Sequence, residues 1–356
     1  MDMRATLTPF HFFGIMLAAA LAALIAACAL PHDSYLRWRS ISDQAVVKAA
    51  WIYERIHFDP SPIDVVFIGT SHSVFGIDSK NVEQACLTAK GRRCASVNFA
   101  LQHLGRNLHW LVAREVIQAR KPRLMFIEVQ ETEFRALHPA YAYLADSSDI
   151  VSAPLLINTS YFPDLARLPL RQFTLFMQSR LPSLFGTRLE FSDSLYRGSH
   201  WNDTYSEAGS FEHPIAHPTP RTRVISVAEL KRQRAHFEST DASSLHLPRP
   251  LRSLEYRANL LYLKDILTLA RRRGVEVRFL YVPTYHGPMS PSFGGFYKAF
   301  APTWPMPQEI TDNHIYWNDI AHLNHDGAIK FSRWLGAGIA KGTLVSTAPQ
   351  PAVHHY

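Results

Sequence analysis

The sequence has few cysteines, little charge and no block of charge of one sign. It contains 3 cysteines and 19% charged residues in 356 residues. So few cysteines exclude a small scaffold held by disulfides, and 47% hydrophobic residues exclude a wholly disordered chain. The 37 basic and 30 acidic residues are scattered without a basic stripe, so we expect no nucleic-acid partner.

Metal-binding patterns are also scarce. Eighteen histidines are spread along the chain without the paired Cys/His arrangement of a zinc site. We therefore expect no metal and no other cofactor.

An uncharged apolar run occupies residues 12–30. Its length, about 19 residues, is roughly what a helix needs to cross the hydrocarbon core of a membrane. Three interpretations remain open for residues 1–33: an uncleaved anchor, a cleaved signal peptide, or a lipoprotein signal acylated at Cys28. We favour the anchor, which makes the chain a single-pass protein of the cytoplasmic membrane.

Cys86 and Cys94 flank a short charged segment. In an oxidising compartment such a pair can close as a disulfide, and the alternative is two unrelated thiols. A disulfide here would place the soluble part in the periplasm, or more generally on the outer face of the membrane.

Strand-like and helix-like patterns alternate after residue 59. Short apolar runs predict strands at 63–69, 95–99, 123–129 and 275–282, and amphipathic spacing predicts helices from near 78 and over 104–120, 254–273 and 324–340. This alternation predicts an α/β domain over 59–345, with a parallel sheet and helices on both faces. An amphipathic helix over 34–58 should link it to the anchor. The stretch from about 135 to 250 breaks the alternation and predicts an insertion that caps the site, and the tail 346–356 is expected to be disordered.

Two short motifs carry candidate chemistry. Ser71 follows Gly69 and Thr70 directly after the first predicted strand, where sites of open α/β sheets lie. Asp319 precedes His322 by three residues, just before the last predicted helix. A carboxylate at this spacing can orient the imidazole that takes a proton from a serine. Each motif alone is equally typical of a turn or a solvated pair.

Taken together, these motifs resemble the SGNH (GDSL-like) hydrolase superfamily over residues 60–135 and 254–340. The resemblance implies a flavodoxin-like parallel sheet, with Ser71 as the nucleophile, His322 as the general base and Asp319 as its orienting carboxylate. An N-terminal membrane segment before this fold is most similar to the membrane-anchored members. These include DltD of teichoic-acid D-alanylation and the alginate O-acetylation proteins.

The oxyanion hole departs from the family pattern. The resemblance implies that the backbone N–H of Ser71 is one donor. His103 stands where the family has a glycine, unless a short gap brings Gly105 there, and Thr132 stands where the family has an asparagine, with Gln130 as the alternative. We keep Ser71, His103 and Thr132 as candidate donors.

Further residues are candidates for contact with substrate. His72 adjoins Ser71, although the simpler interpretation is that it caps the next helix. Tyr285 and His286 follow the 275–282 strand. His200 and Trp201, in the insertion, can stack on a sugar ring or simply pack locally.

The resemblance, together with the apolar segment and the cysteine pair, implies a serine esterase or O-acyltransferase that acts, outside the cytoplasm, on acyl groups of a cell-envelope polysaccharide. The resemblance also implies a membrane-bound O-acyltransferase as partner. The alternative is a catalytically weak or inactive scaffold, or a glycan-binding partner of the same fold, and a plain lipase ranks third.

Overall fold

The computed structural model describes residues 9–41, 46–91, 94–129, 137–202, 205–206, 219–239, 247–291 and 294–342. The chain divides into two compact units. The first unit joins Met1–Ile41 to Pro139–Phe191, and the second joins Ser42–His138 to Ser192–Tyr356.

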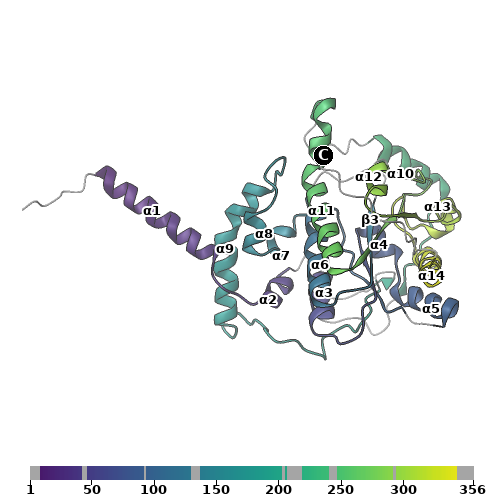
Figure 1. The fold of residues 1–356 in the computed structure, drawn as a ribbon, viewed down its shortest axis with the longest axis horizontal. Helices are drawn as coiled ribbons and strands as arrows, with labels where there is room; N and C mark the ends of the chain where they lie inside the picture. The colour runs from purple at the N-terminus through teal and green to yellow at the C-terminus, as the bar shows by residue number, and fades with distance from the viewer. Residues whose placement is uncertain are drawn as a thin grey trace, which may run out of the picture. The chain divides into compact units, whose positions relative to one another are not determined.

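The first unit is helical (Figure 1). Its helices are α1 (Pro9–Cys28), α2 (Ser34–Arg39), α7 (Tyr141–Leu144), α8 (Ser147–Val151) and α9 (Tyr161–Arg180). Helix α1 is long and apolar enough to cross a membrane over Phe10–Cys28, and no part of that segment is buried. The apolar N-terminal helix predicted from the sequence is therefore present.

The structure differs from two expectations about this part of the chain. The expected continuous helix over 34–58 is instead α2 and a separate helix α3 (Lys48–His57). The reason is that Trp38 of α2 is buried in the first unit, whereas Trp51 of α3 is buried in the second. The predicted insertion is likewise not one piece, because residues 139–191 belong to the first unit and the following residues to the second.

The second unit is built on a five-stranded, all-parallel sheet in the order β2-β1-β3-β6-β7. The strands are β1 (Val65–Ile68), β2 (Ser96–Asn98), β3 (Leu124–Val129), β6 (Glu276–Tyr281) and β7 (Thr303–Pro305). Phe67 of β1 lies beside Asn98 of β2 and Phe126 of β3, so the carboxyl ends of these strands meet at one edge.

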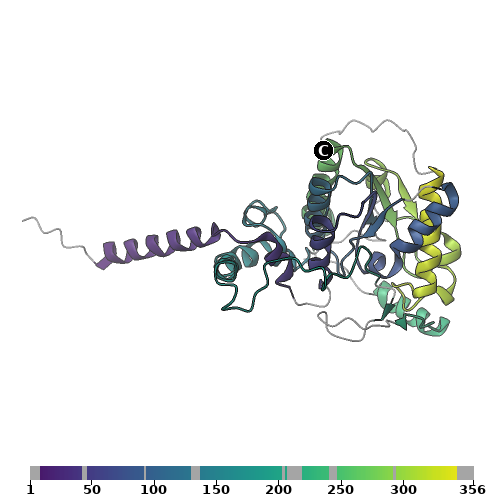
Figure 2. The same ribbon diagram turned by 90° about the horizontal axis from the view of Figure 1, so that it is seen from below.

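Helices cover both faces of this sheet (Figures 1 and 2). Helices α6 (Arg106–Ala119) and α11 (Arg257–Arg273) pack together on one face, while α5 (Ser79–Lys90) and α14 (His325–Lys341) pack together on the other. Val65 and Phe67 of β1 join Phe331 and Leu335 of α14 in one buried apolar cluster. The α/β class with helices on both faces is therefore confirmed.

The remaining elements are short or lie outside the sheet. They are α4 (Ser71–Gly76), a two-stranded pair of β4 (Tyr205–Ser206) and β5 (Thr219–Pro220), α10 (Val227–Ser239), η1 (Arg249–Tyr256), α12 (Gly294–Lys298), α13 (Gln308–Thr311) and η2 (His314–Tyr316). The predicted disordered tail, 346–356, lies outside the described residues.

Cys86 of α5 and Cys94, just before β2, form the predicted disulfide. Their Cα atoms are 6.2 Å apart, and both side chains are buried. Cys28 is a free thiol.

Candidate active site

Three side chains from distant parts of the sequence meet at the carboxyl edge of the sheet. Ser71 begins α4 directly after β1, and Asp319 and His322 lie in the loop between η2 and α14. His322 Nε2 is 2.8 Å from Ser71 Oγ, and His322 Nδ1 is 2.9 Å from Asp319 Oδ2. Nδ1 donates to the carboxylate, so Nε2 is the ring nitrogen that accepts the Ser71 hydroxyl proton.

The electrostatics of Asp319 fit this arrangement. Burial by itself raises the pKa of the Asp319 carboxyl group, but hydrogen bonding and charge from His322 outweigh it. The backbone N–H groups of Ala321 and His322 also donate to Asp319 Oδ1, each at 2.9 Å. The pKa of Asp319 is consequently lowered from 3.8 to about 2, so this group is an anion at neutral pH and favours a positive charge on the imidazole.

The loop that carries Asp319 and His322 is a tight hairpin. Trp317 and Leu323 form an antiparallel bridge, and Asn318 N–H donates to the His322 carbonyl at 2.9 Å. The fully buried Trp317 anchors the loop, with its indole N–H donating to the Ile310 carbonyl. The two side chains are thus held by packing and backbone bonds rather than by their mutual contact alone.

The hairpin leads directly into α14 through a cap. Asn324 accepts a hydrogen bond from Gly327 N–H, as is typical of a residue that begins a helix. A Cβ atom at Gly327 would lie 2.3 Å from the Tyr316 carbonyl oxygen. Only glycine therefore allows the first turn of α14 to approach the loop this closely.

The loop that carries Ser71 rests on Glu128, a buried residue of β3 that the sequence did not indicate. Glu128 Oε2 accepts hydrogen bonds from Thr70 N–H at 2.9 Å, Ser73 N–H at 3.1 Å and Ser73 Oγ at 2.5 Å. Glu128 Oε1 accepts from Thr70 Oγ1 at 2.6 Å. One carboxylate thus holds the residues on both sides of Ser71. The sequence signal was a charged residue within an otherwise apolar strand.

Gly69 is required by the same contact. A Cβ atom there would lie 2.4 Å from Glu128 Oε2 and 2.5 Å from Ser73 Oγ. The glycine after β1 therefore makes room for the carboxylate.

A second layer of buried polar groups supports Glu128. Arg106 donates to the Glu128 carbonyl oxygen at 2.8 Å and to His109 Nδ1 at 3.1 Å. Burial and the positive charge of Arg106 lower the pKa of His109 to about 3, so its ring is neutral. Since Nδ1 accepts from Arg106, the other ring nitrogen donates to the Gly69 carbonyl.

Aromatic rings enclose His322 on two sides. The Phe75 ring is 5.1 Å from the His322 ring and the His72 ring is 5.8 Å from it, both in edge-to-face geometry. His72 Nδ1 bonds the Val282 carbonyl at 3.0 Å, which fixes its ring beside the catalytic candidates. The Arg221 guanidinium lies 4.1 Å from the Phe75 ring and is a further neighbour that the sequence did not indicate.

The candidate oxyanion donors differ in what the structure says of them. Thr70 and Ser73 direct their N–H groups to Glu128, whereas Ser71 is the first residue of α4. His103 is exposed and has a left-handed backbone (φ 64°), a conformation typical of glycine. Thr132 and the alternative Gln130 lie outside the described residues.

The structure does not support two of the predicted substrate contacts. Tyr285 is only 5% exposed, and its ring packs against Trp317 in the core. Its N–H group instead braces the hairpin by donating to the Ile320 carbonyl at 2.8 Å. His286 is exposed and pairs with Asp312 at 3.1 Å. Tyr285 follows β6 and therefore lies near the hairpin, but its ring packs into the core.

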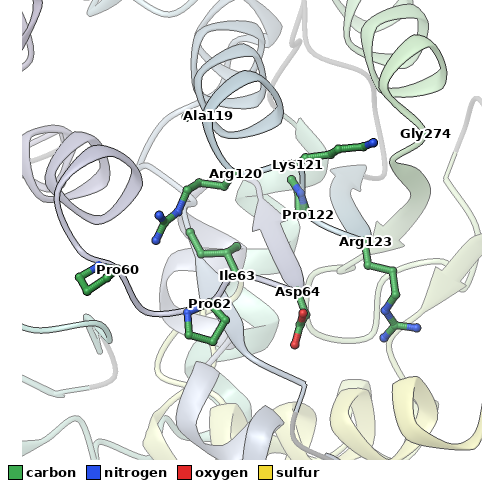
Figure 3. A pocket seen from close by; sticks show the side chains of 10 residues that line it. All are labelled: Pro60, Pro62, Ile63, Asp64, Ala119, Arg120, Lys121, Pro122, Arg123 and Gly274. Carbon is green, nitrogen blue, oxygen red and sulfur yellow. The ribbon is translucent and has the colours of Figure 1, made fainter.

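The opposite, amino edge of the sheet holds two cavities. One, of about 560 Å³, is lined by Asp64, Arg120, Arg123 and their neighbours (Figure 3). The adjoining one, of about 400 Å³, includes His200 and shares Asp64 with the first. Trp201 packs beside Trp51, 5.9 Å between ring centres. The structure therefore favours local packing for Trp201 and places His200 away from the candidate triad.

The described residues contain no cluster of three or more His, Cys, Asp or Glu side chains suited to hold a metal ion. Among known proteins, no family model matches this chain, and no curated protein sequence matches it either.

Proposed function

We propose that the protein is an SGNH-like serine esterase or O-acyltransferase whose catalytic residues are Ser71, His322 and Asp319. The observation that carries the proposal is the series of hydrogen bonds, 2.8 Å from Ser71 Oγ to His322 and 2.9 Å from His322 to Asp319. A nucleophile, a base and an orienting carboxylate in series form the arrangement that activates a serine hydroxyl.

In the proposed reaction, His322 Nε2 takes the Ser71 proton as Oγ attacks the acyl carbon. Asp319, with a pKa of about 2, stays ionised and stabilises the imidazolium that forms. The imidazolium then protonates the departing alcohol, which leaves an acyl group on Ser71. In the second step, water or a sugar hydroxyl attacks this ester and gives its proton to His322. The bond between the acyl carbon and Ser71 Oγ then breaks, and His322 passes the proton to Ser71 Oγ. Water gives hydrolysis, and a bound hydroxyl gives transfer.

The surrounding groups are assigned supporting roles. Glu128 is a positioning residue, because its carboxylate bonds to Thr70 and Ser73, which flank Ser71. The Ser71 N–H is the proposed first oxyanion donor, and the backbone at His103 is a candidate for the second. Removing one such donor typically lowers the rate by about a hundredfold or more.

The fold supports the assignment to the SGNH type. The strand order β2-β1-β3-β6-β7 corresponds to the 2-1-3-4-5 order of flavodoxin-like sheets, whose ligands bind where the winding reverses between the first and third strands. Ser71 follows β1 and Glu128 lies in β3, the two strands at that point.

The proposed substrate is an acylated polysaccharide of the cell envelope. The Cys86–Cys94 disulfide favours an oxidising compartment, and α1 offers a membrane anchor. A membrane-bound O-acyltransferase is the proposed acyl source. A C-terminal reporter fusion should be active only outside the cytoplasm, and a cytoplasmic C-terminus would contradict the envelope substrate.

The decisive experiment is labelling with a fluorophosphonate probe. We expect covalent modification of the intact chain at Ser71, with none in Ser71→Ala and little in His322→Ala. Folded protein that resists the probe and does not hydrolyse a small activated acetate ester would favour the scaffold alternative.

A further inference from the structure

Helix α9 is apolar on two faces, of which the protein covers one. Leu168 and Leu175 are buried within the first unit. On the other side, Phe162, Leu170 and Phe173 are 68%, 72% and 50% exposed. We call these three residues the α9 apolar face; their spacing of eight and three residues places them on one side of the helix.

The segments on either side of α9 add to this surface. Leu155 and Leu156 precede the helix, and Leu184 and Phe185 follow it, each with between 47% and 73% of its surface exposed. Soluble proteins rarely leave so many large apolar side chains exposed in one region, and such surfaces mark contacts with proteins or membranes.

The position of α9 within its unit indicates what its exposed apolar surface contacts. Helix α1 packs against α9 (Figure 1). The Cys28 carbonyl, at the end of the candidate membrane span, accepts hydrogen bonds from Ser147 Oγ at 2.8 Å and Gln172 Nε2 at 3.3 Å. If α1 crosses the bilayer, its last residue lies at the boundary of the hydrocarbon core. The middle of α9 lies at the same depth, because Gln172 touches that residue.

We propose that α9 lies in the membrane interface, with the α9 apolar face inserted at the boundary between headgroups and acyl chains of a phospholipid bilayer. This rests on the proposal that α1 spans the membrane. The polar neighbours fit an interfacial helix: Arg180 lies 5.6 Å from the Phe176 ring, so its stem can cover apolar surface while its charge reaches the headgroups.

The test uses the full chain in vesicles of phosphatidylethanolamine and phosphatidylglycerol. In a Cys28→Ala background, single cysteines replace Leu170 or Phe173 and carry a nitroxide spin label. Collisions with apolar oxygen are then compared with collisions with a water-soluble nickel complex. The control is Leu261→Cys, a leucine 37% exposed on helix α11 of the other unit.

We expect labels at 170 and 173 to collide several-fold more with oxygen than with nickel, and the label at 261 to show the reverse preference. Nickel access at 170 and 173 equal to that at 261 would overturn the proposal, because the face would then be in water. Low access to both reagents would also overturn it, because protein would then cover the face.

A label at Leu17→Cys tests the proposed membrane span of α1 separately from the proposed interfacial position of α9. Leu17 is 52% exposed in the middle of α1 and should be accessible to oxygen alone. Nickel access at 17 would refute the membrane span itself, whereas oxygen access at 17 with nickel access at 170 would refute only the interfacial helix. Neither result depends on the reactivity of Ser71.

Discussion

The two edges of the central sheet differ in what their polar groups do. At the amino edge, Arg120 donates to the carbonyls of Asp59 and Ser61, and Asp64 accepts from Ala95 N–H. At the carboxyl edge, Ser71 and His322 bond to each other, and the His322 side chain remains 26% exposed. Two cavities lie at the first edge, and the candidate chemistry lies at the second.

This difference separates polar groups that hold the fold from polar groups that are bonded to one another in series. Polar side chains that bond to backbone carbonyl and N–H groups help to hold the fold. A reaction needs groups whose donors and acceptors are paired in series and still accessible to substrate. Five substitutions and one pH series test this view, from the strongest expected effect to the weakest.

Ser71→Ala and His322→Ala should have the largest effect, a loss of roughly 10⁴- to 10⁶-fold in kcat. The double mutant should lose nearly the same activity, because the two groups act as one unit. Ester hydrolysis by the purified variants, with circular dichroism to check folding, measures this. Full activity in Ser71→Ala would show that the candidate residues at the carboxyl edge are not catalytic.

Asp319→Asn should cost less, about 10²- to 10⁴-fold in kcat, because the carboxylate orients and stabilises but forms no covalent bond. The isosteric amide keeps the volume of the site and removes its charge. Steady-state kinetics near neutral pH would show this, and a loss as large as that of Ser71→Ala would contradict the assigned role.

Asp319 should also make stability depend on pH. Its pKa is about 2 in the folded protein, below its ordinary value of 3.8, so the unfolded chain binds the proton more tightly. The contribution is complete above about pH 4 and is lost as the pH falls towards 2. Discounted for partial exposure, it is on the order of 1–2 kcal/mol. Urea unfolding of wild type and Asp319→Asn should therefore converge at low pH; a constant difference would contradict this.

Glu128→Gln should lower kcat by roughly 10- to 100-fold with little change in KM, because a misplaced nucleophile slows the chemical step more than it weakens binding. The rate of probe labelling at Ser71 should fall in parallel. Unfolding free energy should drop by about 1–3 kcal/mol, since the amide cannot accept all the bonds that the carboxylate accepts. Lost stability with unchanged kcat would make Glu128 structural only.

Arg123→Ala, at the amino edge, should have the smallest effect. Its side chain lines the larger cavity (Figure 3), on the other edge from Ser71. A surface substitution of this kind usually changes stability by less than about 0.5 kcal/mol, and kcat/KM should stay within about twofold of wild type. A loss comparable to that of Glu128→Gln would break the contrast between the edges.

Local patterns predicted the elements that hold the site. Four of the five strands of the sheet lie within predicted apolar runs, and the helices that Asp78 and Asn324 cap begin near the predicted positions. Strand β7 was missed because it is three residues long and ends in Pro305. The sequence did not predict that residues 34–58 form two helices, or that the insertion is shared between the two units. The hydrophobic spacing shows that a face is buried, but it does not show in which unit.

The sequence by itself determined the α/β class, the apolar N-terminal helix and the residues of the candidate triad, because strand, helix and motif signals are local. Only the tertiary structure decided how Ser71 is held. Glu128, Arg106 and His109 come from a strand and a helix remote from residue 71, and their roles arise from parallel pairing of β1 with β3. Contacts between distant segments depend on how the chain packs, and the spacing of residues along it does not record them.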